Sequence, residues 1–204
     1  SPPPQAQTTT DEAQEWVRWS CGDELQLESI LKRVDVLLLN HGINPGGDQC
    51  PATLSKTLEV NALSHWRLIQ QFEAIADQDQ NRDQPRELWV NTSEAEIQPA
   101  LSPGYELSKR LIGELVSLRW NNYTATQRQA LRLRKLILGP FRSNLNPIGL
   151  LTSGFVARQV VWQANLGVNL IIVTPNPLTY LLMPFVELIR RVYCRALRIN
   201  PPDR

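Results

Sequence analysis

Residues 34–42, VDVLLLNHG, join a continuous apolar run to a polar turn. An apolar run of this length, closed by turn residues, suits a β-strand buried on both faces, as in a parallel sheet. An apolar stripe with helical spacing precedes the run, and a long helical pattern follows Pro51. The stretch therefore predicts a strand between two helices, which is the repeating unit of an α/β fold.

The same alternation continues along the chain. Strands alternating with long helices predict a single-domain α/β fold with a Rossmann-like, doubly wound parallel sheet and right-handed crossovers. The polar residues 77–86 are typical of a surface loop. We expect strands at 87–93 (ELWVNTS), 131–139 (LRLRKLILG) and 169–174 (NLIIVT), and helices at 51–76, 102–120 and 152–167.

The front of the chain differs from this pattern. Residues 1–14 are rich in Pro, Gln and Thr and carry few apolar groups, so we expect a flexible lead-in. WVRWS at 16–20 is aromatic and β-branched, which is typical of a short strand. Gly22 breaks this run, and Asp23 can cap the helix that follows. The apolar stripe of that helix consists of Leu27, Ile30, Leu31 and Val34.

Composition argues for a soluble, cytoplasmic protein without a nucleic-acid partner. The 204 residues carry a net charge of +1, and no run reaches the roughly 18 apolar residues that span a bilayer. The first residues have no apolar core of the kind found in a signal peptide. Cys21, Cys50 and Cys194 lack metal-type spacing, so we expect free thiols in a reducing compartment and no metal site.

Polar and turn-forming residues follow each predicted strand. In parallel sheets the ligand lies beyond the carboxyl ends of the strands, so these residues predict a ligand site. They are Asn40, His41 and Gly42, then Thr92 and Ser93, then Gly139 and Pro140, and finally Thr174 and Pro175.

YELSK at 105–109 adds a candidate for proton transfer. A tyrosine with a pKa of about 10 is a poor acid–base catalyst at neutral pH. Lys109 follows Tyr105 by one helical turn on the same face, and its charge favours the phenolate. Tyr-x-x-x-Lys alone occurs in many helices, but here a strand-end serine stands 12 residues upstream.

Together these motifs resemble the short-chain dehydrogenase/reductase family. LNHG at 39–42 resembles the family's Asn-Asn-Ala-Gly turn, with Leu39 and His41 departing from it. EVNALS at 59–64, VNTS at 90–93, YELSK and LGPFRSN at 138–144 resemble further family segments. The longer strings VDVLLLNHGIN, WVNTSEAE and RKLILGPFRSNLNPIG resemble a cyanobacterial and plant subgroup described as bifunctional sterol desaturase/short-chain dehydrogenase.

The resemblance implies a nicotinamide cofactor, NAD or NADP, and a site for interconverting a hydroxyl and a carbonyl. It implies Tyr105 as the acid–base group, Lys109 as its activator and ribose ligand, Ser93 as the substrate orienter and Asn61 as support for a proton relay. The cofactor-binding residues that it implies are Asn40, His41, Gly42, Tyr105, Lys109, Gly139, Pro140 and Ser143.

Several assignments have alternatives. The family's usual spacing to the tyrosine selects Thr92, whereas the strand-end pattern selects Ser93. Asn61 can instead be an ordinary helical amide, and His41 can be an acid–base group or a turn residue beside the adenosine or solvent. Ser143 and Asn144 either contact the nicotinamide or cap the next segment.

The family's Gly-rich nucleotide-binding turn does not precede Trp16. The first βαβ portion of the family domain is therefore absent from this sequence, and with it the residue that selects between the cofactors. We assign the folded domain to 15–180 and an apolar, basic helix and tail to 181–204. The apolar face of that helix is formed by Leu181, Phe185, Leu188, Ile189 and Val192, and its basic residues are Arg190, Arg191, Arg195 and Arg198.

The apolar and basic pattern of that helix predicts that it contacts a membrane surface, the substrate pocket or a partner subunit. The resemblance also implies a homodimer or homotetramer built on the helices that carry His65 and Tyr105. The leading hypothesis is an oxidoreductase acting on a small, lipophilic substrate. The alternative is a Rossmann-like module that binds a nucleotide or protein without catalysis, or that sits on a membrane as a partner of a desaturase-like protein.

Overall fold

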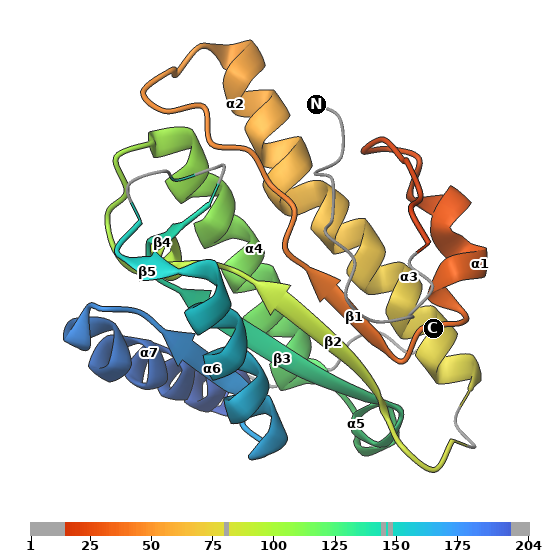
Figure 1. The fold of residues 1–204 in the computed structure, drawn as a ribbon. Coiled ribbons are helices and arrows are strands. Elements are labelled where there is room, and N and C mark those ends of the chain that lie inside the picture. The colour runs from red at the N-terminus through yellow and green to blue at the C-terminus, as the bar shows by residue number, and fades with distance from the viewer. Residues whose placement is uncertain (1–14, 80–81, 144–145, 147–148, 197–204) are drawn as a thin grey trace.

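The computed structural model describes residues 15–79, 82–143, 146 and 149–196. Its centre is a parallel sheet in the order β1-β2-β3-β6 (Figure 1). The strands are β1 (Val36–Leu39), β2 (Arg86–Asn91), β3 (Leu131–Leu138) and β6 (Leu170–Val173). The α/β fold and the parallel sheet predicted from the alternating pattern are confirmed.

Helices cover both faces of this sheet (Figure 1). One face carries α3 (Ser64–Gln78), α4 (Pro103–Asn122) and α7 (Pro177–Ala196), and the other carries α6 (Ser153–Asn165). A helix α2 (Pro51–Leu58) leads into α3 through the π-helical turn η2 (Glu59–Leu63). The smaller elements are η1 (Glu24–Leu27), α1 (Glu28–Leu31), η3 (Glu94–Glu96), α5 (Ala125–Ala130), β4 (Phe141–Arg142) and β5 (Leu151–Thr152).

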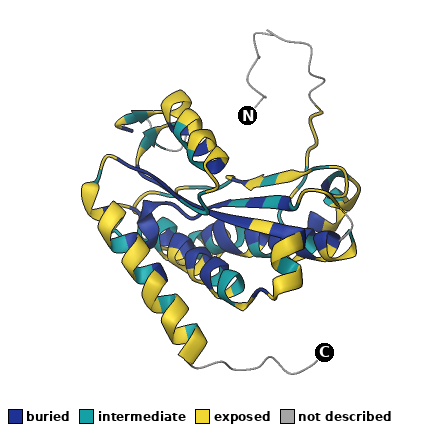
Figure 2. Ribbon diagram, turned by 90° about the horizontal axis from the view of Figure 1, so that it is seen from below, coloured by how far each residue is buried: buried dark blue, intermediate teal, exposed yellow. Residues whose placement is uncertain are grey.

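The core follows from the alternation of side chains along the strands. On β2, Leu88 and Val90 are completely buried against the α3 and α4 layer, where Phe72 is also completely buried. Trp89 points to the opposite face and packs in the cluster that includes Val160 of α6. Figure 2 shows this pattern as buried strands between helices whose outer surfaces are exposed.

The burial predicted for β1 is wrong on one face. Leu39 is buried, but Val36 is 48% exposed and Leu38 is 51% exposed. Among the described residues β1 pairs with β2 alone, and α6 packs over β6 and the β4–β5 ribbon rather than over β1. The continuous apolar run indicates a strand, but burial on its second face needs a covering element that the described residues do not supply.

The strand predicted at 16–20 is also absent. This segment has no regular structure, because among the described residues no neighbouring strand offers it a ladder of hydrogen bonds. Trp19 instead packs on the core and makes an edge contact with His41, with ring centroids 5.4 Å apart. Asp23 occupies the N-cap position before η1 but makes no side-chain capping bond.

The ends of the predicted domain differ in detail. Helix α7 begins at Pro177, before the predicted 181, because a proline suits the first turn of a helix. The short α5 was not predicted, although Thr124 and Gln127 form a capping box at its start. The predicted lead-in at 1–14 and the tail at 197–204, which includes Arg198, lie outside the described residues.

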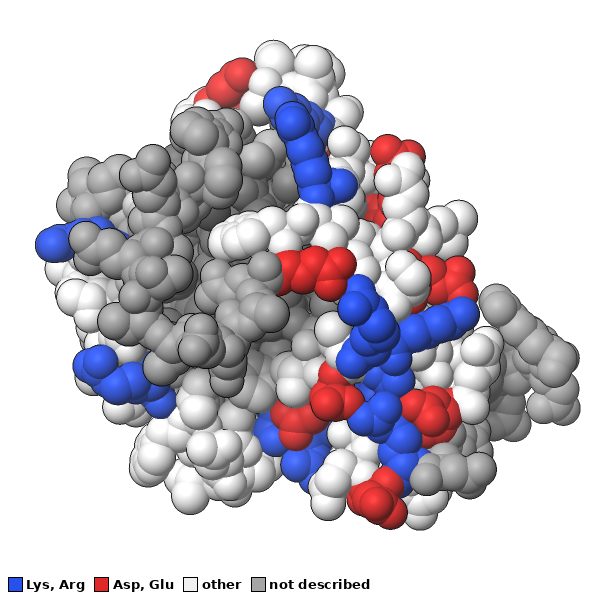
Figure 3. Space-filling view, turned by 45° about the vertical axis from the view of Figure 1, so that its right-hand side comes forward, with Lys and Arg blue, Asp and Glu red and all other residues white. Residues whose placement is uncertain are grey.

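Charges of both signs lie interspersed on the face drawn in Figure 3. Among the ion pairs, Arg67 bonds to Glu24 at 2.7 Å and also to Glu59. The three cysteines are free thiols, as predicted. In the part of the chain that the structure describes, no helix has the length and hydrophobicity needed to cross a membrane.

Candidate active site

Asn91, the last residue of β2, connects three of the predicted site segments. Its backbone oxygen accepts a 2.9 Å hydrogen bond from Lys109 Nζ, and its side-chain nitrogen donates to Asn40 Oδ1 at 2.6 Å. Its side-chain oxygen accepts a 3.1 Å bond from the backbone N–H of Ser93. Because β1 and β2 are parallel, their carboxyl ends meet at one edge of the sheet, where α4 supplies the lysine.

Tyr105 and Lys109 lie on the first turns of α4, which begins at Pro103. Lys109 Nζ is 5.7 Å from the centre of the Tyr105 ring. Burial lowers the pKa of Lys109 to about 8, because an ammonium group is poorly solvated there. Burial raises the pKa of Tyr105, and a hydrogen bond with the Ser93 side chain opposes that rise.

Ser93 and Thr92 point in different directions. The Thr92 hydroxyl is completely buried and lies 3.5 Å from the backbone oxygen of Leu136 on β3. The Ser93 hydroxyl accepts a 3.3 Å bond from the Ala95 amide and lies 3.5 Å from the Leu138 oxygen, and its hydrogen bond with Tyr105 opposes the rise in the pKa of that tyrosine. Ser93 has φ 69° and ψ 158°, a region used almost only by glycine, and it is the sole non-glycine residue with positive φ among those described. This geometry favours Ser93 over Thr92 as the substrate orienter.

Asn61 lies inside the π-helical turn η2 and is fully buried. Its side chain accepts from the backbone N–H of Ile43 at 2.8 Å and donates to the oxygen of Ile43 at 2.9 Å. It also donates to Ser108 Oγ on α4 at 3.0 Å. Single π-turns inside helices occur frequently at functional sites. Asn61 therefore fixes the turn after β1 against α4, which is more than an ordinary helical amide does.

The His41 side chain is engaged in hydrogen bonding near the end of β1 and is not available as a free base. Its Nε2 lies 2.8 Å from Ser64 Oγ, and His65 Nε2 lies 3.0 Å from the His41 backbone oxygen. Burial, aided by the charge of Lys109, lowers the pKa of His41 to about 4. Burial and the neighbouring His41 lower the pKa of His65 to about 2. Both rings are neutral at pH 7, so His41 is a poor proton donor there.

Gly139, Pro140 and Ser143 follow the end of β3. A Cβ atom on Gly139 would lie 2.3 Å from Thr174 Oγ1, so only glycine permits this approach of the backbone to the end of β6. The Pro140 oxygen accepts a 3.0 Å bond from Leu150. Ser143 pairs with Asn146 through a local bridge, in keeping with the capping alternative, and Asn144 lies outside the described residues.

Sequence reasoning did not assign roles to Asn91, Ser108 or the carboxylates of η3. Asn91 stands within the quoted VNTS segment, and its position at the last residue of a predicted strand was the available signal. Ser108 lies between Tyr105 and Lys109 and donates to the Tyr105 backbone oxygen at 2.7 Å. Nothing in the local sequence indicates that Asn61 is its partner, because the two are 47 residues apart.

Comparisons with known proteins agree with these motifs. No protein-family model matches the chain. Monoglucosyldiacylglycerol epimerase of Synechocystis sp. is 41% identical over 179 residues, which are 88% of this chain and 42% of that protein. The chain thus spans less than half the length of this curated relative.

Solved structures provide the comparison of folds. An alcohol dehydrogenase specific for bulky-bulky ketones from Comamonas testosteroni matches with a TM-score of 0.68 at 14% identity, over 90% of this chain and 73% of that one. A short-chain dehydrogenase from Sphingobium yanoikuyae, solved with NADPH, matches with a TM-score of 0.67 at 13% identity, over 89% and 74% of the two chains. The chain therefore has the fold of the short-chain dehydrogenases, as its motifs predict.

Proposed function

We propose that this chain carries the acid–base site of a nicotinamide-dependent oxidoreductase that interconverts a secondary hydroxyl and a carbonyl. The observation that carries the proposal is the meeting of Tyr105, Lys109 and Ser93 around Asn91. These groups come from a strand end and a helix, and a tyrosine, an ammonium and a serine are the donors that carbonyl reduction needs.

The residues present fit the nicotinamide and ribose part of such a cofactor. Lys109 uses one hydrogen bond on Asn91 and has further protons for ribose hydroxyls. Gly42 lies close to the Asn61 side chain, since a Cβ atom on Gly42 would be 3.0 Å from Asn61 Oδ1. Asn40, Gly42 and Lys109 would hold the group together with Tyr105. When bound, the nicotinamide supplies or accepts the hydride.

The chain's own residues then handle the proton and the substrate oxygen. In reduction, the Tyr105 hydroxyl donates its proton to the carbonyl oxygen, and in oxidation the phenolate takes the proton back. The charge of Lys109 favours the phenolate. The hydrogen bond with the Ser93 side chain opposes the rise in the pKa of Tyr105 that burial causes. The Ser93 hydroxyl hydrogen-bonds the substrate oxygen and orients it toward Tyr105.

Asn61 and Ser108 support proton exchange with solvent. Asn61 joins the turn after β1 to Ser108, and Ser108 is bonded to the backbone of Tyr105. The π-helical turn around Asn61 shifts the hydrogen-bond ladder of the helix and leaves backbone oxygens that can accept from water. We propose that these groups hold the water through which Lys109 exchanges its proton.

The substrate that we propose is the sugar headgroup of a diacyl glycolipid, because the curated relative is named as an epimerase of monoglucosyldiacylglycerol. Epimerisation at a carbinol carbon follows from the same site. Tyr105 would take the hydroxyl proton while a bound oxidised nicotinamide would accept the hydride, which would leave a ketone. Return of the hydride to the other face of the ketone carbon, and of the Tyr105 proton to its oxygen, would give the epimer without consuming a further oxidant or reductant.

Because the proposed substrate is a lipid, we also propose that α7 contacts the bilayer. Its outer face exposes Leu181 at 70%, Phe185 at 58%, Leu188 at 54% and Val192 at 58% (Figure 2). Arg191 and Arg195 are exposed on the same helix, whereas its acidic residue Glu187 is buried. An apolar face flanked by cations suits an anionic membrane surface. We also propose a cytoplasmic location and a homodimer or homotetramer.

The test uses the full-length protein with monoglucosyldiacylglycerol in mixed micelles and NAD, beside a Tyr105→Phe variant. If the same hydride returns to the substrate, the epimeric product formed in D2O should carry no solvent deuterium at the inverted carbon. The Tyr105→Phe variant should form no product. Deuterium at that carbon would contradict the redox route. Binding of NADH or NADPH without turnover of the glycolipid or of a panel of ketones would favour the non-catalytic module.

Membrane contact is tested separately by sedimentation with phosphatidylglycerol vesicles. We expect wild type to sediment with these vesicles less strongly at high salt, and a Phe185→Ser/Leu188→Ser variant to stay in solution. Equal sedimentation of both proteins would contradict a contact through α7. A lower oligomeric state of the variant in size-exclusion chromatography would instead identify this face as a subunit interface.

A further inference from the structure

Ser93 needs an external constraint to keep its backbone conformation. At φ 69° and ψ 158° its Cβ is crowded, and residues in such regions persist only where the surroundings hold them. The next three residues form the short turn η3, in which the backbone N–H of Glu96 donates to the Ser93 oxygen at 3.2 Å. The orientation of Ser93 therefore depends on where η3 is held.

Glu94 connects η3 to the end of β6 and the start of α7. The carboxylate is buried and accepts a 2.9 Å hydrogen bond from Thr174 Oγ1, and a second bond from the Thr179 hydroxyl. Thr179 is completely buried in the first turn of α7. One carboxylate thus joins two hydroxyls that are 80 and 85 residues away in the sequence.

Glu96 connects the other end of η3 to the interior of the sheet. Its side chain is fully buried and accepts 2.6 Å and 2.7 Å hydrogen bonds from Lys135 Nζ on β3 and Arg190 Nη1 on α7. It lies directly over Gly113 of α4, where a Cβ atom would be 2.2 Å from the Glu96 Cδ. Glycine at 113 is the residue that leaves room for this carboxylate.

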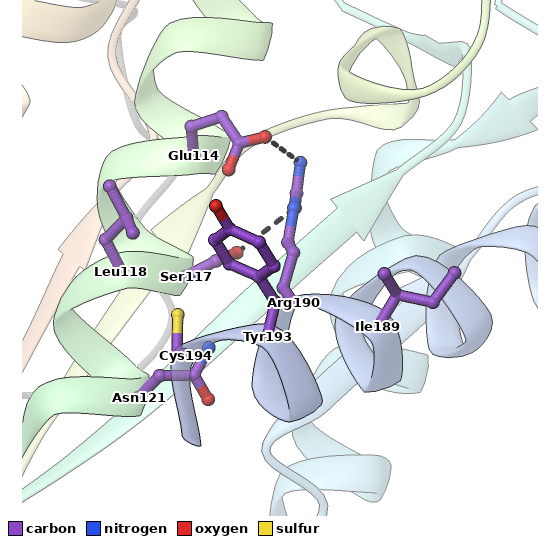
Figure 4. Close-up of a pocket in the computed structure, with 8 residues that line it drawn as sticks. All are labelled: Glu114, Ser117, Leu118, Asn121, Ile189, Arg190, Tyr193 and Cys194. Carbon is purple, nitrogen blue, oxygen red and sulfur yellow. Dashed lines mark hydrogen bonds and ion pairs between the residues drawn. The ribbon is translucent and has the colours of Figure 1, made fainter. Parts of the chain in front are cut away.

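The same contacts join α7 to α4. Arg190 reaches across to Glu114 at 2.8 Å and to Ser117 at 3.2 Å, beside a cavity of about 270 Å³ between the two helices (Figure 4). Lys135 also donates to Ser117 and to Glu187, both at 2.8 Å. Two buried carboxylates and two cations balance in charge, so removal of any one of these four charges would leave another charge buried without its partner.

We propose that Glu94 and Glu96 are positioning residues that hold η3 against α7 and β3 and so keep Ser93 in its glycine-like conformation opposite Tyr105. This role rests on the proposed function of Ser93. It makes the inner side of α7 part of the active-site architecture, although no residue of α7 touches Tyr105 or Lys109 in the contacts described. The buried hydrogen bonds of these two glutamates hold Ser93 in a backbone conformation that glycine would adopt without such support.

The test is a double-mutant cycle between Thr179→Val and Ser93→Ala. Thr179→Val removes one bond to Glu94 at nearly constant volume. We expect it to lower kcat on the order of tenfold to a hundredfold, because a small misplacement of an orienting group has that effect, with unchanged binding of NADH or NADPH. In a Ser93→Ala background the same substitution should lower kcat no further. Additive losses would overturn the proposal.

Two matched variants separate positioning from general destabilisation. Thr179→Ser keeps the hydroxyl and should restore kcat. Ser117→Ala removes a buried hydroxyl of the same charged cluster that bonds to neither Glu94 nor Glu96. We expect this control to lose stability without the loss of kcat, and an equal loss of kcat would contradict the assignment.

A second readout needs no substrate. The amides of Glu96 and Ile97 donate within η3, to Ser93 and Glu94. Hydrogen exchange at these amides should accelerate in Thr179→Val but not in Ser117→Ala. Unchanged exchange would contradict the positioning role even in a protein that shows no turnover, whereas faster exchange with no wild-type turnover would contradict only the proposed function.

Discussion

Lys109 Nζ donates a 2.9 Å hydrogen bond to the backbone oxygen of Asn91, so the ammonium group of α4 is held at the carboxyl end of β2. The same asparagine accepts from the amide of Ser93 and donates to Asn40. A lysine, a serine and the turn after β1 are therefore positioned by one residue at the sheet edge.

Removal of the Ser93 hydroxyl and removal of the Thr92 hydroxyl should have different effects on kcat. Ser93→Ala removes the group that faces Tyr105 and should lower kcat by a factor of about 100 or more, on the scale of a lost oxyanion donor. Thr92→Val removes a buried hydroxyl that lies against Leu136 and should leave kcat within about threefold. Steady-state kinetics of both variants checks this, and the reverse order would assign the role to Thr92.

Replacing Ser93 with glycine should separate stability from activity. Glycine relieves backbone strain of about 1–3 kcal/mol at φ 69°, and part of this gain is offset by the greater freedom of glycine in the unfolded chain. We expect Ser93→Gly to unfold at higher urea concentration than Ser93→Ala, while both lack activity. If the alanine variant is equally stable, Ser93 is not strained.

The buried ammonium of Lys109 should make stability rise with alkaline pH. Its pKa is about 8 in the folded chain against 10.5 in the unfolded one, so between these values the unfolded state binds the additional proton. Relative to Lys109→Met, wild type should gain about 2 kcal/mol of unfolding free energy between pH 8 and pH 10. Urea denaturation at each pH measures the difference, and a constant difference would show that Lys109 is solvated.

We expect His41 and His65 to cause a loss of stability on mild acidification. Their pKa values of about 4 for His41 and about 2 for His65 lie below 6.5, so below pH 6.5 the unfolded chain binds protons that the folded chain excludes. Each should contribute about 2 kcal/mol of loss between pH 7 and pH 5, a range above the titration of most carboxylates. A His65→Gln variant should show a slope reduced by half, and an unchanged slope would contradict the assignment.

Two glycine-to-alanine substitutions in helices should have opposite effects. Gly113→Ala places a Cβ against Glu96 and should destabilise the chain by about 1–3 kcal/mol, in the range of overpacked cores. Gly154→Ala, on α6, meets only the end of Arg158 at 3.9 Å and should stabilise by up to about 1 kcal/mol through helix propensity. Thermal unfolding measures both, and a neutral Gly113→Ala would show that Glu96 moves freely.

Local patterns were sufficient for much of the fold and part of the site. Apolar runs and helical stripes predicted β1, β2, β3 and β6 and the helices between them. The four-residue spacing placed Tyr105 and Lys109 on one face of α4, since helical periodicity depends on the local chain alone. By contrast, 16–20 has a strand-like composition but no partner strand, and a strand needs that partner to form.

Sequence by itself thus determined the order of elements, the parallel sheet and the residue types available at its edge. Tertiary structure decided that β1 is covered on one face, that Ser93 rather than Thr92 faces Tyr105, and that Glu94 and Glu96 hold the turn after Ser93. The physical reason is that periodicity records which face of an element is apolar. The cationic partners of the buried Glu96 carboxylate, for example, are 39 and 94 residues away in the sequence, and only packing brings them together.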